Sequence, residues 1–323
     1  MSNATEQLQE HRKQYLYVKR TNGTLMREAD KILRRFITFC SPYLEDECCL
    51  PEEAVKIWNA RRSNESDSTL RHRVNDVRAF AEYLQSKGIK AYVGDKIRSE
   101  RSNFSPYIFT NAELAALFNA ADSLPLNPTY PHRSAILSLV FKTIYACGLR
   151  ISEIMHLTVD CMDFENGVLT LRQAKFGKDR LVPIHPVLLE KFIQYKNTSY
   201  FPKEPKAPFF PSTKGTAFSD NAIYDAFRTL LLAAGISHGG RGHGPRVHDL
   251  RHTFAVHCLR KWVKSGEDLT VALPYLSAYL GHNGLQSSQI YLHLTAEMFP
   301  DIVDSFEKKF DVLPDWGEFC ETN

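Results

Sequence analysis

The first hundred residues alternate apolar and polar positions with the period of an α-helix. Between Thr24 and Phe39, apolar residues recur every three or four positions, with arginines and lysines interleaved. Pro51 stands at a helix-start position before a second such segment, and a third, which we expect Thr69 to cap, ends at Gly88. The polar face of the third segment carries Arg71, Arg73, Arg78 and Lys87. The pattern predicts a helical N-terminal domain whose basic faces suit either solvent or a nucleic acid.

The remaining chain mixes helical with strand-like patterns. Residues 99–108 read as a polar linker after a domain over residues 1–98. Thr110 and Glu113 predict a capping box, and the apolar run 134–146 predicts a core helix that stops at Gly148, followed by a short helix with Arg150 and Glu153. Runs 168–172 and 180–184 flank a turn and predict a β-hairpin, and helices are expected over 220–234, 248–263 and 274–280. The predicted fold class is mainly α with a small β-sheet: a helical N-terminal domain and a mixed α/β domain over residues 109–300.

Composition and charge narrow the class of protein. Apolar residues make up 43% of the chain and charged residues 24%, as in ordinary globular proteins, and no apolar run reaches the roughly 18 residues that a membrane span needs. Seven cysteines without a CxxC pair favour a reducing cytoplasm over a disulfide framework. Residues 1–108 and 109–300 each hold 19 basic and 15 acidic side chains, whereas residues 301–323 hold two and seven. A mildly basic body suits a polyanionic partner, although an unevenly charged solvated surface explains it equally well.

Several residues in the second half suit chemistry on a phosphate anion. Arginines donate two parallel hydrogen bonds to phosphate oxygens, and histidines donate hydrogen bonds or transfer protons near neutral pH. A tyrosine hydroxyl becomes a nucleophile where cationic neighbours activate it, and a lysine at a hairpin tip can protonate a leaving oxygen. Together these are the parts of a metal-free phosphoryl transfer through phosphotyrosine, and the candidates are Arg150, Lys175, His248, Arg251, His282 and Tyr291.

Each candidate also has a structural interpretation. Arg150 and Lys175 could be solvated surface residues, and Tyr291 could be a core residue within its apolar surroundings. His248 and His252, four positions apart on a predicted helix, could bind zinc, but no third ligand follows at a zinc-protease spacing. We therefore expect no metal and no cofactor, and a structural role for His252. The joint occurrence of the candidates in tight order favours the catalytic interpretation.

The same segments resemble a known family. ACGLRISEIMHL (146–157), HDLRHTFA (248–255) and YLGHNGLQSSQIYLH (279–293) closely resemble the three signature boxes of the tyrosine recombinase (phage integrase) family, and QAKFGKDRLVPIH (173–185) is similar to its lysine-bearing hairpin. The resemblance covers residues 109–300 and implies a helical core-binding (SAM-like) domain before a mixed α/β catalytic domain. Lys175 and Lys178 both flank the hairpin turn; Lys175, before Phe-Gly, matches the family's lysine better.

The resemblance implies a site-specific recombinase that cuts and rejoins double-stranded DNA in the integration, excision or transposition of mobile DNA. Tyr291 would attack the scissile phosphate and form a 3′-phosphotyrosine. The other positions would serve that step, with Arg150 and Arg251 on the non-bridging oxygens, His282 as a donor to the phosphate, His248 as acceptor of the tyrosine proton and Lys175 as general acid.

The resemblance also implies partners. Family members work as tetramers on DNA, and the tail over 301–323 carries Ile302, Val303, Phe306 and Phe310 at the spacing of a helix that docks on a neighbouring protomer. Packing of this tail on its own protomer is the alternative, and accessory recombination proteins are further partners to consider. Two other functions stay open: a type IB topoisomerase-like nicking and resealing enzyme, and a non-catalytic DNA-binding accessory protein. The intact Tyr291, Arg150 and Arg251 argue against the latter.

Overall fold

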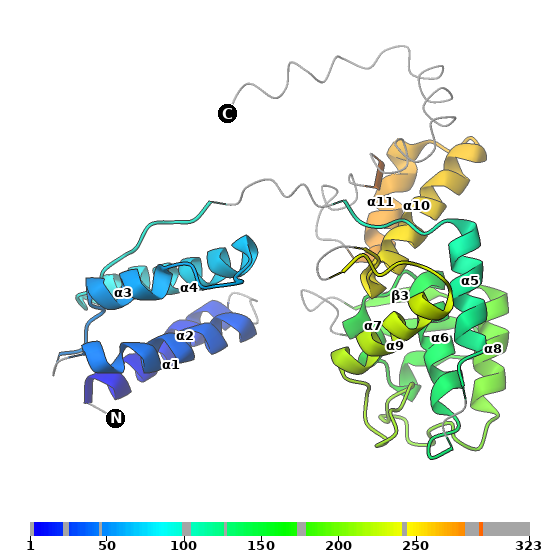
Figure 1. Ribbon diagram of the computed structural model, residues 1–323, viewed down its shortest axis with the longest axis horizontal. Coiled ribbons are helices and arrows are strands. Elements are labelled where there is room, and N and C mark those ends of the chain that lie inside the picture. Colours follow the sequence, from blue (N-terminus) through cyan, green and yellow to red (C-terminus); the bar gives the residue numbers. More distant parts are fainter. Residues whose placement is uncertain are drawn as a thin grey trace, which may run out of the picture. The chain divides into compact units, whose positions relative to one another are not determined.

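The computed structural model describes residues 3–21, 26–44, 47–98, 105–125, 128–172, 179–240, 244–281 and 291–292. The chain divides into two compact units, Met1–Phe104 and Ser105–Asn323, each of which we describe by itself (Figure 1). The boundary falls inside the segment that we expected to be a linker. Predictions for Lys175, Lys178, His282 and the tail over 301–323 lie outside the described residues.

The N-terminal unit is helical, as its sequence pattern predicts. Its described elements are α1 (Asn3–Thr21), α2 (Arg27–Cys40), the 3-10 turn η1 (Ser41–Tyr43), α3 (Glu52–Asn59) and α4 (Asp67–Ser86). Helix α1 was not predicted individually, because its buried apolar positions are few and widely spaced among polar residues. Aromatic side chains dominate the core: Phe36 meets Trp58 edge-on with ring centroids 5.3 Å apart, and Tyr15 meets Phe80 at 5.7 Å.

The start of α4 corrects one predicted cap. Ser66, not Thr69, is the N-cap residue, and its hydroxyl accepts a hydrogen bond from the Thr69 amide at 3.2 Å. Both residue types cap helices well, and the backbone decides between them: Ser66 is extended, whereas Thr69 already lies in the first turn. Gly88, with a φ of +75°, follows the C-terminal end of α4, where a left-handed residue commonly terminates a helix.

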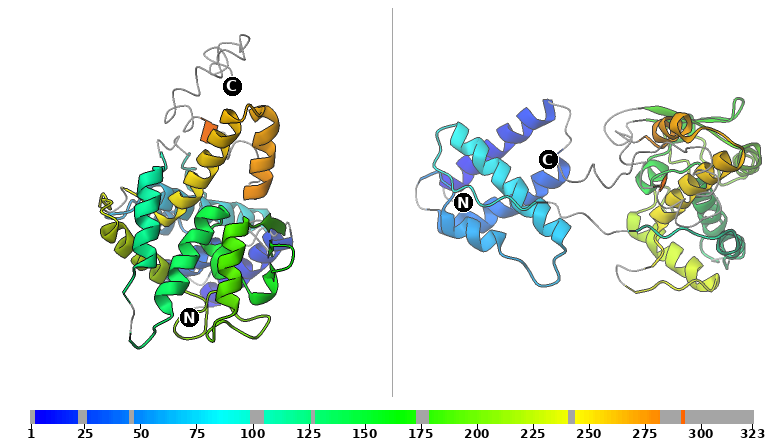
Figure 2. Two further views of the ribbon diagram at one scale, coloured as in Figure 1. Left: turned by 90° about the vertical axis from the view of Figure 1, so that its right-hand side faces the viewer. Right: turned by 90° about the horizontal axis from the view of Figure 1, so that it is seen from above.

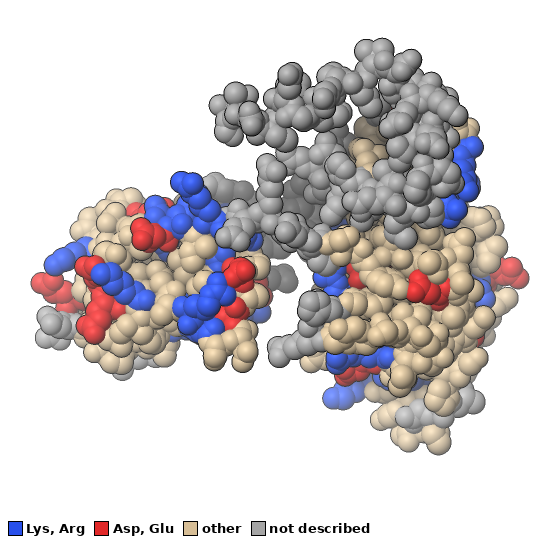
Figure 3. Space-filling view, turned by 45° about the horizontal axis from the view of Figure 1, so that its top comes forward, with Lys and Arg blue, Asp and Glu red and all other residues tan. Residues whose placement is uncertain are grey.

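Arg73 corrects the predicted basic face of α4. Its side chain is only 5% exposed and donates to both carboxylate oxygens of Glu65, at 2.8 and 2.7 Å, and to the Ala60 carbonyl at 3.1 Å. The guanidinium therefore ties the α3–α4 connection to α4 and does not belong to a surface for a partner. On the face shown in Figure 3, the remaining basic side chains of this unit lie among acidic ones.

The second unit combines helices with one small sheet. Its described elements are α5 (Asn111–Asp122), α6 (Arg133–Ala146), α7 (Ile151–Met155), η2 (Val159–Cys161), β1 (Met162–Asp163), β2 (Val168–Leu171), β3 (Arg180–Pro183), α8 (Pro186–Lys196), α9 (Asp220–Ala233), α10 (Val247–Lys264) and α11 (Leu269–Leu280). Thr110 and Glu113 form the predicted capping box of α5. Helix α6 is the predicted core helix, with eight buried residues.

The sheet is antiparallel with the order β1-β2-β3. Leu169 pairs with Val182 and Leu171 pairs with Arg180, so the two predicted hairpin strands are present. Leu169 and Val182 are fully buried, whereas Leu181 is 66% exposed, as expected for strands with one face on the core. The alternation places the Arg180 side chain on the same face of β3 as buried Val182.

Helix α10 lies against α6 and α11 (Figures 1 and 2). Ahead of α5, the Phe109 amide donates to the Thr253 hydroxyl of α10 at 3.0 Å, which joins the start of the unit to this group. Helix α11 begins at Leu269, five residues before the predicted start at Pro274. Buried leucines at positions 269, 273, 276 and 280 keep one apolar stripe through the proline, and this packing outweighs the helix hydrogen bond that proline lacks. Among the described residues, no helix is long and apolar enough to span a bilayer.

Candidate active site

The turn between α6 and α7 fixes the backbone of Arg150. Gly148 has a φ of +58°, and a Cβ there would lie 2.6 Å from the Phe254 ring, so only glycine fits the close approach of α10. Arg150 then caps α7: its amide donates to Glu153 Oε2 at 2.8 Å and its Nη1 to Glu153 Oε1 at 2.7 Å. The predicted short helix is thus present, with Arg150 held by a carboxylate three residues later.

The first turns of α10 present His248, Arg251 and His252. Asp249, which is 1% exposed, closes the N-terminus of the helix by accepting the Arg246 amide at 2.7 Å. Arg251 is equally buried and donates to the carbonyl oxygens of Gly148 at 2.7 Å and Leu280 at 2.6 Å. Burial, and then the charge of Arg150, lower the pKa of Arg251 to about 10, so the guanidinium remains charged at neutral pH.

Three arginines meet at the C-terminal end of α11. Arg180 Nε donates to the Tyr279 carbonyl at 2.9 Å, Arg251 to the Leu280 carbonyl, and Arg150 Nη2 to the Gly281 carbonyl at 2.9 Å. Carbonyls at a helix C-terminus have no partner inside the helix and carry the negative end of its dipole, so they attract cations. We call Arg150, Arg180, Arg251 and Glu153 the arginine cluster.

Glu153 is the shared anion of the arginine cluster. Arg180 donates to both of its oxygens, at 2.7 and 2.8 Å, and Arg251 Nη1 lies 3.8 Å from Oε2. Burial alone would raise the pKa of Glu153, but hydrogen bonds from Arg180 and the Arg150 amide, with the charges of both arginines, lower it to about 2. Three cations against one carboxylate leave a net charge of +2, which suits an oxyanion such as phosphate.

Tyr291 is buried beside this cluster. The residue is 2% exposed, and its hydroxyl lies 3.1 Å from Nδ1 of His252. Burial raises the pKa of Tyr291, while the charge and hydrogen bond of Arg251 and the charge of Arg150 oppose that rise. The arrangement places a tyrosine oxygen between a histidine and the arginines, as a phosphate-directed nucleophile requires.

His252 connects His248 to Tyr291. Its ring meets the ring of His252 edge-on, with centroids 4.7 Å apart, and His252 in turn contacts Tyr291. Burial, followed by the charges of His252 and Arg251, lowers the pKa of His248 to about 3, so the imidazole is neutral at pH 7. His252, to which we assigned a structural role, is therefore the histidine that touches the tyrosine hydroxyl.

The structure brings together four of the six predicted site residues: Arg150, His248, Arg251 and Tyr291. Lys175, its alternative Lys178, and His282 lie outside the described residues. Glu153 and Arg180 were not among the predicted site residues, although two signals point to them. Glu153 follows Arg150 at capping-box spacing, and Arg180 occupies a core-facing strand position, where a charge needs a partner. Within the described ranges, no three His, Cys, Asp or Glu side chains are grouped to hold a metal ion.

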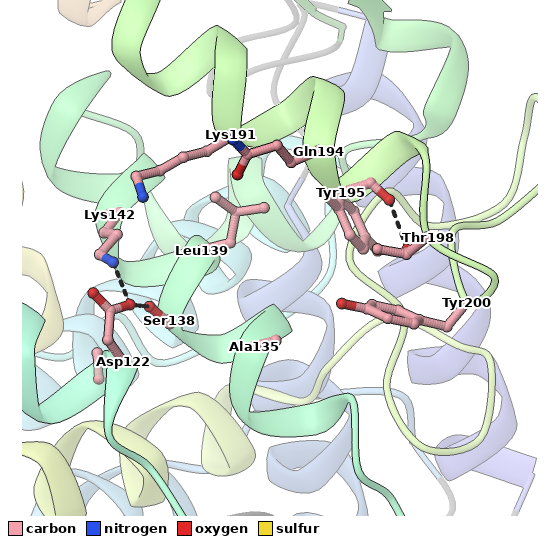
Figure 4. A pocket seen from close by; sticks show the side chains of 11 residues that line it. Asp122, Ala135, Ser138, Leu139, Lys142, Lys191, Gln194, Tyr195, Thr198 and Tyr200 are labelled. Atoms are coloured by element: carbon pink, nitrogen blue, oxygen red, sulfur yellow. Dashed lines mark hydrogen bonds and ion pairs between the residues drawn. The ribbon is translucent and has the colours of Figure 1, made fainter.

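A separate hollow of about 310 Å³ lies between α6 and α8 (Figure 4). Lys142 pairs there with Asp122, which also accepts the Ser138 hydroxyl at 2.7 Å, and Lys191 extends over the same opening. Arg150, His248, Arg251 and Tyr291 do not line it. Lys142 and Asp122 offset each other, so Lys191 leaves this hollow with a net charge of +1, against +2 for the arginine cluster.

Comparison with known proteins assigns the chain to a family. The family model described as the phage integrase family matches residues 108–298. The chain is 28% identical over 306 residues to the integrase/recombinase y4rB of Sinorhizobium fredii, covering 92% of this chain and 96% of that protein. It is 29% identical to the tyrosine recombinase XerC of Rhizobium meliloti, covering 84% and 83% of the two chains.

Solved structures share the fold. A post-cleavage complex of the site-specific recombinase XerH with its palindromic difH substrate matches with a TM-score of 0.60 at 20% identity, covering 94% of this chain and 85% of that one. A lambda integrase dimer bound to a COC′ core site matches with a TM-score of 0.58 at 17% identity, covering 86% and 96%. These matches confirm the predicted fold class, and the sequence matches confirm the predicted resemblance. The chain belongs to the phage integrase family of tyrosine-type site-specific recombinases.

Proposed function

We propose that this tyrosine recombinase cuts and rejoins double-stranded DNA through a 3′-phosphotyrosine on Tyr291. One observation carries the proposal: Tyr291 lies against Arg251 and within the field of Arg150, in a cluster with an excess of positive charge. Fixed cations stabilise the negative charge that grows on a phosphate during transfer, and they lower the energy of a nearby phenolate. The geometry therefore supports attack by the tyrosine oxygen on a bound phosphodiester.

The proposed step balances as a single exchange at phosphorus. The Tyr291 oxygen bonds to the scissile phosphorus while the bond to the 5′-oxygen breaks, and Arg150 and Arg251 bind the non-bridging oxygens. The tyrosine proton passes to His248, Lys175 supplies a proton to the leaving 5′-oxygen, and His282 donates a hydrogen bond to the phosphate. The phosphotyrosine keeps the energy of the broken ester, so a 5′-hydroxyl from another duplex reverses the step without a cofactor.

The contact of Tyr291 with His252 refines this proposal. The tyrosine hydroxyl lies 3.1 Å from Nδ1 of His252, so His252 is the imidazole that contacts it in this structure. The rings of His252 and His248 meet edge-on with centroids 4.7 Å apart, so the proposed proton acceptor His248 lies next to the histidine that contacts the hydroxyl. Since the pKa of His248 is held at about 3, mainly by burial, a bound phosphate would need to raise it for the ring to keep the proton.

We further propose that the chain works as a homotetramer on DNA, assembled through the tail over 301–323. Exchange between two duplexes involves four strand cleavages and hence four protomers. A lambda integrase has been solved as a tetramer bound to a Holliday junction. Ile302, Val303, Phe306 and Phe310 supply an apolar helical stripe for docking on a neighbour. The proposed substrates are mobile DNA, with or without accessory recombination proteins, and the proposed setting is the reducing cytoplasm, which the scattered cysteines support.

A two-site DNA substrate tests recombination against simple nicking and resealing. Purified protein is incubated with a plasmid that carries two copies of its recognition site, and products are separated by length and topology. We expect deletion or inversion products whose junctions retain the exchanged strands. Relaxed plasmid without any exchanged junction would indicate a type IB topoisomerase-like enzyme, and bound but uncut DNA would indicate an accessory protein.

A further inference from the structure

Arg180, the first residue of β3, has no part in the phosphotyrosine chemistry proposed above. All three nitrogens of its guanidinium nevertheless donate to protein acceptors: Nε to the Tyr279 carbonyl at 2.9 Å, and Nη1 and Nη2 to the two oxygens of Glu153 at 2.7 and 2.8 Å. The side chain is 10% exposed. Such a two-point contact with a carboxylate is a geometry that arginine makes and lysine cannot.

The strand forces this side chain inward. Arg180 shares the core-facing side of β3 with buried Val182, whereas Leu181 between them is exposed. A charge on the core side of a strand is costly unless it is paired and hydrogen-bonded. Glu153 on α7 and the Tyr279 carbonyl at the end of α11 supply the partners, so Arg180 joins β3 to α7 and α11 (Figure 1).

Arg180 contacts both groups that hold Arg150. Glu153 Oε1 accepts from Nη1 of Arg150 and from Nη1 of Arg180, each at 2.7 Å. The second partner of Arg150 is the Gly281 carbonyl, and a Cβ at Gly281 would lie 2.9 Å from Nη1 of Arg180. The side chain of Arg180 therefore packs directly against the backbone that positions Arg150.

Arg180 also changes the charge that Arg150 can offer. With Arg180 absent, Glu153 would be shared by Arg150 and Arg251 alone, and the net charge of the cluster would fall from +2 to +1. With Arg180 present, the carboxylate is already compensated by a guanidinium that faces the protein. The positive charges of Arg150 and Arg251 then remain for an anion.

We propose that Arg180 is a positioning residue, which holds and neutralises Glu153 so that Arg150 binds the scissile phosphate in a fixed orientation. The inference rests on the proposed function and deepens it, because Arg180 acts through Arg150 and does not touch the DNA. It predicts a defect in the chemical step at the phosphate, separate from protonation of the leaving group.

Single-turnover cleavage of a DNA duplex by matched variants tests the inference. Arg180→Gln should bind DNA nearly as tightly as wild type but cleave about 100-fold more slowly, the scale expected for a misplaced catalytic group. Arg180→Lys, which keeps the positive charge but cannot make the two-point contact with the carboxylate, should cleave at a rate between those of wild type and Arg180→Gln. Removing the uncompensated carboxylate as well, in Arg180→Gln/Glu153→Gln, should restore part of the lost rate. Arg172→Gln is the control, because exposed Arg172 flanks the other hairpin strand and pairs with Asp160 at 2.8 Å; it should cleave normally.

A second substrate separates the phosphate from the leaving group. A 5′-bridging phosphorothiolate has a leaving sulfur that needs no proton, so it should not rescue Arg180→Gln. Three outcomes would overturn the inference. They are rescue of Arg180→Gln by the phosphorothiolate substrate, a wild-type cleavage rate for Arg180→Gln, and a double variant that cleaves no faster than Arg180→Gln. If thermal unfolding shows that Arg180→Gln does not fold, Arg180→Lys decides: we expect an about tenfold loss on both substrates, and a wild-type rate contradicts the inference. An adduct that survives Tyr291→Phe would instead contradict the proposed function, which keeps the two failures distinct.

Discussion

At the scale of the residue, Arg251 shows how the fold maintains a buried cation. Its guanidinium is 1% exposed and donates to the Gly148 and Leu280 carbonyls. Leu280 is the last residue of α11, where the helix dipole favours a cation, and Gly148 lies two residues after the end of α6. Moving such a charge out of water costs several kcal/mol or more, and the acceptors offset only part of that cost. The cation is thus held in place before any phosphate arrives, as preorganised catalysis requires.

His248 gives the molecule a measurable pH dependence. Burial is the main cause that lowers its pKa to about 3, whereas an unfolded histidine titrates near 6.5. Between these values the unfolded chain binds the proton and the folded chain does not, so stability falls as the pH falls from 6.5 towards 3. Between pH 7 and pH 5 we expect the free energy of unfolding of His248→Gln to fall by about 2 kcal/mol less than that of wild type. Denaturant unfolding at both pH values measures the difference.

Exposed His156 supplies the matched control for that experiment. His156→Gln should retain the wild-type pH dependence of unfolding. If His248→Gln loses as much stability on acidification as wild type does, His248 is not held neutral by its surroundings, and the proposed change of its pKa on DNA binding loses its basis.

Sequence reasoning found the candidate residues that carry a local pattern and missed those that act across elements. Arg150, His248, Arg251 and Tyr291 stand in recognisable segments, and the structure brings them together. The ion pair of Glu153 with Arg180 joins residues 27 positions apart on α7 and β3, and no helical or strand period encodes such a pairing. The sequence signal for this ion pair was the core-facing position of Arg180, where a buried charge needs a partner.

At the scale of the element, helices and strands were predicted correctly where the capping or turn residues at their ends and the apolar pattern along them indicated the same boundaries. The capping box of α5, the apolar run of α6 and the hairpin strands are present as expected. The prediction for α11 was wrong at its start, because a proline was given more weight than the leucine stripe that begins at Leu269. Arg73 was wrongly placed on a basic surface, since a helical pattern does not distinguish a solvated arginine from one paired with a distant Glu65.

The hairpin that joins β2 and β3 carries the proposed general acid. Lys175→Ala should cleave ordinary DNA about 100-fold more slowly or worse, because the leaving 5′-oxygen lacks a proton donor, while DNA affinity changes little. A 5′-bridging phosphorothiolate should restore most of the rate. Single-turnover cleavage of the two substrates measures both effects, and the contrast with Arg180→Gln separates leaving-group chemistry from phosphate positioning.

Lys178→Ala is the control within the same hairpin and should show neither the defect nor the rescue. If Lys178→Ala is the variant that sulfur rescues, the general acid lies three residues from the proposed one. If neither variant responds, the proton comes from elsewhere, and the hairpin serves only to bind DNA.

At the scale of the whole molecule, each unit has a hydrophobic core of its own. The N-terminal core gathers around Phe36, Trp58 and Phe80, and the core of the second unit extends through α6, α9 and the sheet. Separate cores are expected of domains that can each fold by themselves. Assembly then depends on contacts between protomers, for which the acidic tail is the proposed element.

Deletion of residues 301–323 tests the tail. The truncated protein should bind a single DNA site as wild type does, yet assemble complexes with paired sites poorly, because Phe306 and Phe310 no longer dock on a neighbour. Gel-shift and light-scattering measurements on one-site and two-site DNA give the comparison. Substitution of both phenylalanines by alanine is the sharper variant, and unchanged tetramer assembly would favour a tail that packs on its own protomer.

The central claim is that Tyr291 becomes covalently joined to DNA, and trapping of that adduct tests it most directly. A nicked duplex from which a short cleaved fragment diffuses away prevents religation, so the protein–DNA adduct accumulates and is resolved by denaturing electrophoresis. Wild type should form an adduct on the 3′-phosphate, and Tyr291→Phe should bind the same DNA and form none. Tyr279→Phe, which alters a half-buried tyrosine whose ring stacks on Phe254, should still form it. Adducts of wild-type yield from Tyr291→Phe would contradict the account.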